Sequence, residues 1–228
     1  MMIRLFFIRF FDIILSSLAI IMLFPFMLPI IIMLKLTGEH DVFYKQKRIG
    51  RYGKEFYVIK FATMLRNSPN LPGGLFTLKD DPRILPLGKF LRKTKINELP
   101  QLINVFMGQM SIVGYRPLVR KGYEKYSCEM KKRLYNHRPG LSGIGSIALR
   151  REEEIMQGID DKDKFYKNII MPYKGELESW YIDNIGIITY FKIIIITVIS
   201  VIRKSSNIFK KSFKKLPSVP KEIEECLG

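Results

Sequence analysis

The stretch Ile13–Leu34, which reads IILSSLAIIMLFPFMLPIIIML, runs for 22 residues without a charged side chain. As a helix it would be ~33 Å long, enough to cross the hydrocarbon core of a bilayer. Pro25 and Pro29 lie inside it, and each removes a backbone donor, which kinks or breaks a helix. The stretch therefore predicts a membrane helix that is interrupted at its prolines.

The residues on both sides of this stretch are basic. Arg4 and Arg9 precede it, and Lys35, Lys45, Lys47, Arg48, Arg51 and Lys54 follow it. Because basic flanks favour the cytoplasm, a straight crossing would place one flank on the wrong side. A re-entrant helix-break-helix, which enters and leaves by the same face, satisfies both flanks. An ordinary kinked transmembrane anchor is the alternative.

The composition of the chain excludes several classes of protein. With 228 residues, 47% hydrophobic, it has too much apolar surface for a disordered polyelectrolyte and too few long uncharged stretches for a polytopic membrane protein. Its two cysteines are far apart and its histidines number only two, so neither a disulfide framework nor a histidine-rich metal centre is expected. No GxxxxGK[ST] or GxGxxG loop occurs.

A second apolar run, Ile185–Ile202, is followed by a lysine-rich tail that reaches Lys215. Phe209, Phe213 and Leu216 recur between the tail lysines at helical spacing, which predicts an amphipathic helix in the membrane interface. The net charge of +17 therefore indicates an anionic lipid surface as the partner. No nucleic-acid motif accompanies these lysines, so we expect no nucleic-acid partner.

Between the apolar runs the sequence predicts a mixed α and β fold dominated by helices. Two strands, Val42–Gln46 and Glu55–Phe61, are expected to form a hairpin through Gly50–Gly53. Helices are expected at Leu87–Arg92, at Leu99–Phe106 and, as one amphipathic helix, at Leu118–Tyr135; residues 67–74 are expected to be a loop. We divide the chain into a membrane anchor (1–36), a core (37–184) and an interfacial helix with a basic tail (185–228).

Three features of the core are candidates for chemistry. Asn97 is a predicted helix N-cap, where free N–H groups favour phosphate, and the adjacent Glu98 offers oxygen ligands to a divalent cation. Arg116 and Arg138 each precede a proline, which would hold a guanidinium fork for phosphate oxygens. Lys60 lies at the end of a predicted strand. Taken singly, each also fits a cap, a solvated charge or a surface turn.

In order along the chain, these features resemble one family, the bacterial sugar transferases, which are monotopic polyprenyl-phosphate phosphoglycosyl transferases. The resemblance covers roughly residues 3–202. The motifs that carry it are QKRIG (46–50), KFATM (60–64), DPRI (81–84), GKFLRKT (88–94), NELPQLINV (97–105), GQMSIVGYRP (108–117), RPGLSG (138–143) and WYIDN (180–184).

The resemblance implies an activity and a location. Such proteins transfer a sugar phosphate from a nucleoside diphosphate sugar, most often a UDP-sugar, to a polyprenyl phosphate and so initiate polysaccharide or glycoconjugate synthesis. They lie on the cytoplasmic face of the bacterial inner membrane and require Mg²⁺. Partners implied are membrane lipid, both substrates, and either a second copy of the chain or a partner transferase.

The resemblance also implies site residues. An adjacent Asp-Glu pair serves the family: the Asp attacks phosphorus and the Glu helps to bind the metal. Glu98 matches the metal-binding Glu, and Lys60, Arg92, Arg116 and Arg138 match cations that bind phosphate.

At the position of the nucleophilic Asp this chain has Asn97, and a carboxamide cannot form a phospho-aspartyl intermediate. Three readings follow: direct attack by the polyprenyl phosphate, use of Glu98 or another carboxylate as nucleophile, or a non-catalytic homologue that binds a ligand or a partner. Tyr115, Gln109 and Ile144 also depart from the family pattern, the last where donor selectivity would change.

Overall fold

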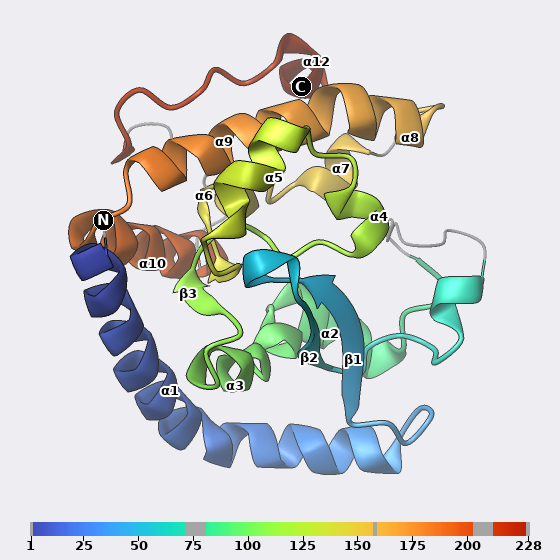
Figure 1. The fold of residues 1–228 in the computed structure, drawn as a ribbon. Helices are drawn as coiled ribbons and strands as arrows, with labels where there is room; N and C mark the ends of the chain where they lie inside the picture. Colours follow the sequence, from blue (N-terminus) through green and yellow to red (C-terminus); the bar gives the residue numbers. More distant parts are fainter. Residues whose placement is uncertain (1, 72–80, 157–158, 203–211, 227–228) are drawn as a thin grey trace.

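The structure is a computed structural model that describes residues 2–71, 81–156, 159–202 and 212–226. Over these residues it is mostly helical (Figure 1). The α-helices are α1 (Met2–Leu36), α2 (Pro86–Lys93), α3 (Gln101–Phe106), α4 (Arg120–Tyr123), α5 (Cys128–Tyr135), α6 (Ile144–Ala148), α7 (Glu152–Ile155), α8 (Lys162–Phe165), α9 (Met171–Asp183), α10 (Ile187–Ile202) and α12 (Lys221–Glu225). Short 3-10 turns are η1 (Arg51–Gly53), η2 (Ser68–Asn70) and η3 (Ile96–Glu98), and η4 (Tyr166–Ile170) is a π-helical turn before α9. The strands are β1 (Phe43–Ile49), β2 (Glu55–Phe61), β3 (Ser111–Val113) and β4 (Gly140–Ser142).

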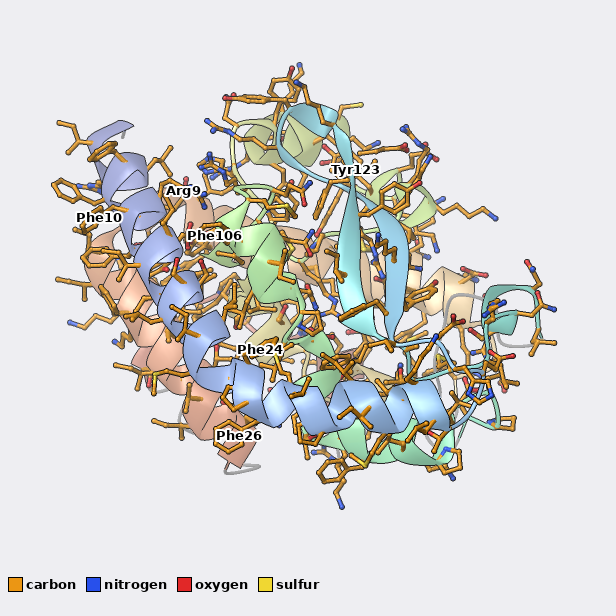
Figure 2. The ribbon with its side chains drawn as sticks, turned by 90° about the horizontal axis from the view of Figure 1, so that it is seen from below. Arg9, Phe10, Phe24, Phe26, Phe106 and Tyr123 are labelled. Carbon is orange, nitrogen blue, oxygen red and sulfur yellow. The ribbon has the colours of Figure 1, made fainter. Side chains whose placement is uncertain are left out.

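The apolar stretch at the N-terminus forms one helix, α1, with Pro25 and Pro29 inside it. The prediction that the prolines interrupt this helix is therefore wrong, because the helix continues through both of them. Instead α1 bends sharply partway along its length (Figure 1), and in Figure 2 the bend lies close to Phe24. The physical reason is that a proline removes single hydrogen bonds, which bends a helix that its neighbours still support. Within the described residues, α1 is the one helix long and apolar enough to cross a membrane.

Both ends of α1 pack against the same body of protein. Near the N-terminus Ile8 joins the main core, and Asp12 is buried. Near the C-terminus Leu34 packs with Phe61 and Leu91. Apolar side chains are nevertheless exposed along the whole helix, among them Phe10 on the first arm, Phe24 and Phe26 near the bend (Figure 2), and Leu36 at the end. The bend therefore points an apolar apex away from the core while both arms stay attached to it.

The predicted hairpin is confirmed. β1 and β2 pair in antiparallel register, with Gln46 opposite Val58 and Arg48 opposite Phe56. Phe56 and Val58 are buried, so the alternation of side chains places Gln46, Arg48 and Lys60 on the same inward face. The hairpin therefore presents three polar side chains toward the body of the protein.

A second pairing, which the sequence analysis did not predict, joins β3 and β4 in parallel. Gly114 and Gly140 meet across it so closely that a Cβ on Gly140 would lie 2.1 Å from the Gly114 nitrogen. Only glycine permits this approach. The pairing brings the segment that carries Arg116 against the Arg138-Pro139-Gly140 segment.

The predicted single helix over Leu118–Tyr135 is wrong. The structure divides this segment into α4 and α5, and Ser127 caps the second helix by accepting a hydrogen bond from the Met130 N–H at 3.1 Å. Apolar spacing compatible with one helix continues across the division, whereas α4 ends at Tyr123 and the capping Ser127 starts a new helix. The helices predicted at Leu87–Arg92 and Leu99–Phe106 are present as α2 and α3, and α3 begins two residues later than predicted, at Gln101.

The largest apolar core lies around α9 and α10. Leu177 on α9 and Tyr190 and Ile193 on α10 are fully buried, and α10 lies beside the N-terminal arm of α1 (Figure 1). Phe209 of the predicted tail helix lies outside the described residues. Beyond it Phe213 is buried against Trp180, with ring centroids 5.4 Å apart, in a turn rather than a long helix. The predicted helix is therefore wrong for residues 213–216, because Phe213 packs against the core.

Candidate functional site

The site forms where the end of β2 meets η3. Lys60 extends from β2, and its Nζ lies 3.1 Å from Oε1 of Glu98. Arg116, on the segment after β3, brings its Nη2 to 3.9 Å from the same oxygen. Three segments that are far apart in the sequence thus converge on one carboxylate.

Asn104 fixes the distance between α3 and β2. Its Nδ2 donates to the Tyr57 carbonyl at 2.7 Å, and its Oδ1 accepts from the Ile59 N–H at 3.0 Å. Asn104 is completely buried on α3, so this pair of bonds fastens α3 to the backbone of β2 next to Lys60. The separation of Lys60 and Glu98 is therefore set by backbone contacts and not by their own attraction alone.

A small pocket opens between these segments. The residues that line it are Arg48, Val58, Lys60, Glu98, Gln101, Arg116, Pro117, Gly140 and Leu141. Among them are three cations and a single carboxylate, so the lining carries a surplus of positive charge. Such a pocket favours an anion with several oxygens, and guanidinium groups suit phosphate geometry.

Burial shapes the protonation of the site. Burial lowers the pKa of Lys60 to about 8, although the neighbouring Glu98 acts in the opposite direction. Burial alone would raise the pKa of Glu98, but Lys60, Arg116 and Lys95 outweigh it and hold that pKa well below its usual range. Burial, and next the nearby Arg116, lowers the pKa of Arg48 to about 10. At neutral pH the site therefore contains three cations and one carboxylate anion.

Asn97 is not the helix N-cap that the sequence suggested. It lies inside η3, is buried, and makes no capping bond, while Pro100 occupies the position before α3. The Asn97 Oδ1 atom has no hydrogen-bond partner in the described part of the chain. A buried oxygen without a donor is unfavourable unless a ligand or an ion supplies a partner.

A divalent cation fits the residues present. The Glu98 carboxylate and the unpaired Asn97 Oδ1 are oxygen donors of the kind that Mg²⁺ prefers, and Mg²⁺ commonly binds through one carboxylate and substrate phosphates. Across the described residues no group of three His, Cys, Asp or Glu side chains is placed to hold a metal without a substrate. These donors are therefore suited to a metal that arrives with its substrate.

Two of the predicted phosphate-binding residues lie outside the pocket lining. Arg92, on α2, has its Nη1 3.7 Å from Sδ of Met64. Arg138 donates from Nε to the Gly108 carbonyl at 2.9 Å, and burial lowers its pKa. The structure thus brings Lys60, Glu98 and Arg116 together, with Asn97 adjacent in η3, and does not bring Arg92 or Arg138 into that pocket.

Two residues of the lining, Arg48 and Gln101, were not among the site residues predicted from the sequence. Arg48 lies within the QKRIG motif, and Gln101 lies within NELPQLINV. Strand alternation carries a signal for Arg48, because its partner across the hairpin, Phe56, is a large apolar residue on the buried face. Nothing in the local pattern distinguishes Gln101 from a solvent-facing residue of α3.

The model of the family described as bacterial sugar transferase matches residues 3–204. This chain belongs to that family. A Klebsiella pneumoniae sugar transferase, named UDP-glucose:undecaprenyl-phosphate glucose-1-phosphate transferase, is 36% identical over 191 residues, which cover 82% of this chain and 38% of the relative. The undecaprenyl-phosphate galactose phosphotransferase of Salmonella typhimurium is 34% identical over 191 residues, 77% of this chain and 36% of the relative. The exopolysaccharide production protein PSS of Rhizobium leguminosarum bv. phaseoli is 34% identical over 198 residues, 84% of this chain and 93% of the relative.

These three relatives differ in how much of their length they share with the chain. The chain spans little more than a third of the Klebsiella and Salmonella proteins but nearly all of the Rhizobium protein. The match to the family model, over residues 3–204, includes Lys60, Glu98 and Arg116. The family assignment, which the sequence motifs predicted, is therefore confirmed.

Proposed function

We propose that this chain transfers a sugar 1-phosphate from a nucleoside diphosphate sugar, with UDP-sugars as the first candidates, to a polyprenyl phosphate, and so initiates polysaccharide or glycoconjugate synthesis. The observation that carries the proposal is the cationic pocket around Glu98, formed by Arg48, Lys60 and Arg116. The names of the relatives, which specify undecaprenyl phosphate and sugar phosphotransfer, support the same reaction.

The residues of this chain favour direct transfer. A phosphate oxygen of the acceptor attacks the donor phosphorus that bears the sugar, and the bond from that phosphorus to the bridging oxygen breaks. The nucleoside monophosphate leaves with that oxygen, so charge and atoms balance without a protein nucleophile. Asn97 supplies no nucleophilic carboxylate, while Glu98 is already engaged by Lys60.

Lys60 and Arg116 would hold the phosphoryl oxygens and stabilise the negative charge that grows on the leaving phosphate. Glu98 would bind Mg²⁺, with Asn97 Oδ1 as a second oxygen donor. When bound, Mg²⁺ would neutralise diphosphate charge as a Lewis acid. Arg92 and Arg138 remain proposed phosphate contacts outside the pocket lining.

The test of the reaction is release of UMP from a panel of UDP-sugars by purified protein with Mg²⁺ and polyprenyl phosphate. We expect the wild type to be active and Glu98→Gln to lose at least about 100-fold in rate, as expected when a group that holds the metal is removed. Glu129→Gln, which removes an exposed carboxylate on α5, is the matched control and should leave the rate unchanged.

The variants at position 97 separate the three readings. Direct transfer predicts that the wild type forms no covalent phosphosugar adduct when it is incubated with UDP-sugar alone and that Asn97→Ala retains measurable turnover. An adduct on a carboxylate of the wild type would contradict direct transfer. Turnover by Asn97→Asp alone, with an inactive wild type, would show that the native chain is non-catalytic.

We also propose that the chain is monotopic on the cytoplasmic face of the bacterial inner membrane, with α1 as a re-entrant anchor. Support comes from the attachment of both arms of α1 to one body of protein, through Asp12 at one end and Leu34 at the other. The exposed apolar apex between them is suited to hydrocarbon.

Cysteine accessibility tests this topology. Ile3→Cys and Leu36→Cys change exposed positions at the two ends of α1, in a background with Cys128→Ser and Cys226→Ser. Both cysteines should react with an impermeant maleimide only after the cytoplasmic side is opened. Labelling of the two positions from opposite sides of the membrane would overturn the re-entrant anchor.

A further inference from the structure

Arg48 is a cation in the pocket that forms no ion pair with a carboxylate of the described residues, although the charge of nearby Glu98 acts on it. Its Nε and Nη2 both donate to Oε1 of Gln46, and its Nη1 donates to the Pro117 carbonyl at 3.0 Å. No acidic side chain in the described ranges forms an ion pair with it. A half-buried guanidinium is thus held by two neutral oxygens only.

The neutral partners have an electrostatic consequence. A carboxylate at position 46 would neutralise Arg48, whereas the Gln46 amide fixes the guanidinium plane and leaves its full charge. The hairpin register places Gln46 and Arg48 on the same face, so this pair is built into β1. The arrangement orients a cation without cancelling it, which is what an anion-binding site requires.

A second donor in the same pocket has no partner. Gln101 lines the pocket and is only 3% exposed, and its Nε2 has no hydrogen-bond partner in the described part of the chain. Because a buried amide donor without an acceptor is costly, its ligand should be rich in acceptor oxygens. Arg48 and Gln101 therefore indicate the same chemistry from independent observations.

We propose that Arg48 binds phosphoryl oxygens in this pocket and that Gln46 is a positioning residue, which orients the Arg48 guanidinium group without neutralising its charge. The inference rests on the proposed function, since both the donor diphosphate and the acceptor phosphate offer such oxygens. It adds Arg48 to the residues proposed to contact phosphate, and it explains why residue 46 has an amide and not a carboxylate.

The decisive variant is Gln46→Glu, which keeps the shape of the side chain and adds the missing negative charge. A carboxylate beside Arg48 should preserve or raise the melting temperature, yet weaken phosphate binding by about 10- to 100-fold. Arg48→Gln should weaken binding to a similar extent, and Arg48→Lys, which keeps the charge but loses the fork, should lie in between. Lys47→Gln, on the opposite and exposed face of β1, is the matched control and should bind like the wild type.

Two sets of measurements show whether Arg48 contacts the donor or the acceptor. UDP and uridine are titrated into each protein in nanodiscs, and KM for polyprenyl phosphate is measured where turnover permits. Weaker UDP binding with unchanged uridine binding assigns Arg48 to the donor, and a change confined to KM for polyprenyl phosphate assigns it to the acceptor. Either result supports the inference.

Other outcomes overturn it. If Gln46→Glu and Arg48→Gln bind UDP and use polyprenyl phosphate as the wild type does, Arg48 is not a phosphate contact. If Gln46→Glu lowers the melting temperature in parallel with the affinities for UDP and uridine, the pair is merely structural. If the wild type itself binds neither UDP nor polyprenyl phosphate, the proposed function fails and this inference fails with it.

Discussion

Lys60 and Glu98, 38 residues apart in the chain, form an ion pair of 3.1 Å in which both side chains are less than a fifth exposed. The strand that carries Lys60 is fastened by Asn104 to the helix that follows Glu98. The pair therefore depends on how β2 meets α3, and its protonation can be measured independently of activity.

The first prediction concerns the pKa of Lys60. Glu98→Gln removes the negative charge that raises this pKa, while the burial that lowers it stays. We expect the pKa to fall below its wild-type value of about 8 in the variant. Titration of the lysine ¹³Cε resonance without divalent cations measures it. If the pKa of Lys60 in Glu98→Gln equals that in the wild type and in the control Glu129→Gln, then the Glu98 charge does not raise it.

The second prediction concerns the pH dependence of donor binding. A phosphate ligand favours protonated Lys60, whose pKa in the free protein is about 8. The affinity for UDP should therefore be nearly constant up to about pH 7, fall about twofold by pH 8, and then fall by up to about tenfold per pH unit until the pKa of the bound protein is passed. Lys60→Arg keeps the charge over this range, so its profile should be flat. A profile as steep as that of the wild type would assign the titration to another group.

The third prediction concerns Glu178, which lies behind Arg116. It is buried, accepts a hydrogen bond from the Arg116 backbone N–H, and has its pKa raised by burial to about 8. Because the folded pKa is above the unfolded value, its favourable contribution is complete below about pH 4.5 and is lost as pH rises to 8. Glu178→Gln should be more stable than the wild type at pH 8.5, by about 1 kcal/mol or more.

Thermal unfolding of both proteins at pH 6 and pH 8.5 measures this effect. The difference in melting temperature between Glu178→Gln and the wild type should widen at the higher pH. A difference that stays constant would show that Glu178 does not titrate in the folded protein.

The fourth prediction concerns the attachment of α1 to the core. Oδ1 of Asp12 accepts hydrogen bonds from Ser111 Oγ at 3.0 Å, the Ile112 N–H at 2.8 Å and Tyr190 Oη at 2.9 Å. Asp12→Ala leaves these three buried donors without an acceptor and should cost about 3 kcal/mol or more. Asp12→Asn, which retains an acceptor oxygen, should cost less.

Unfolding in nanodiscs provides the measurement, with Ser17→Ala as the matched control on α1. Among the residues that the structure describes, the Ser17 hydroxyl bonds only to the Ile13 carbonyl of its own helix, so its loss should change stability by less than about 0.5 kcal/mol. Equal effects of Asp12→Ala and Ser17→Ala would show that Asp12 does not hold the helix to the core.

Local periodicity accounts for what the sequence predicted about the fold. Alternation of apolar residues was enough to find β1 and β2, and helical spacing was enough for α2 and α3. It failed at Leu118–Tyr135, because Ser127 starts a new helix within a spacing that looks continuous. It failed again at Phe213, whose partner Trp180 is distant in the sequence.

The sequence by itself determined the apolar N-terminal helix, the hairpin, the family motifs and the presence of Lys60, Glu98 and Arg116. Only the tertiary structure decided that these three converge with Arg48 and Gln101, that Arg92 and Arg138 lie outside that pocket lining, and that both arms of α1 attach to one body. The physical reason is the distance along the chain over which each kind of interaction acts. Periodicity and turn chemistry act over a few residues. The charge surplus of the pocket depends instead on two contacts between distant segments: the parallel contact of Gly114 with Gly140, and the hydrogen bonds between Asn104 on α3 and the backbone of β2.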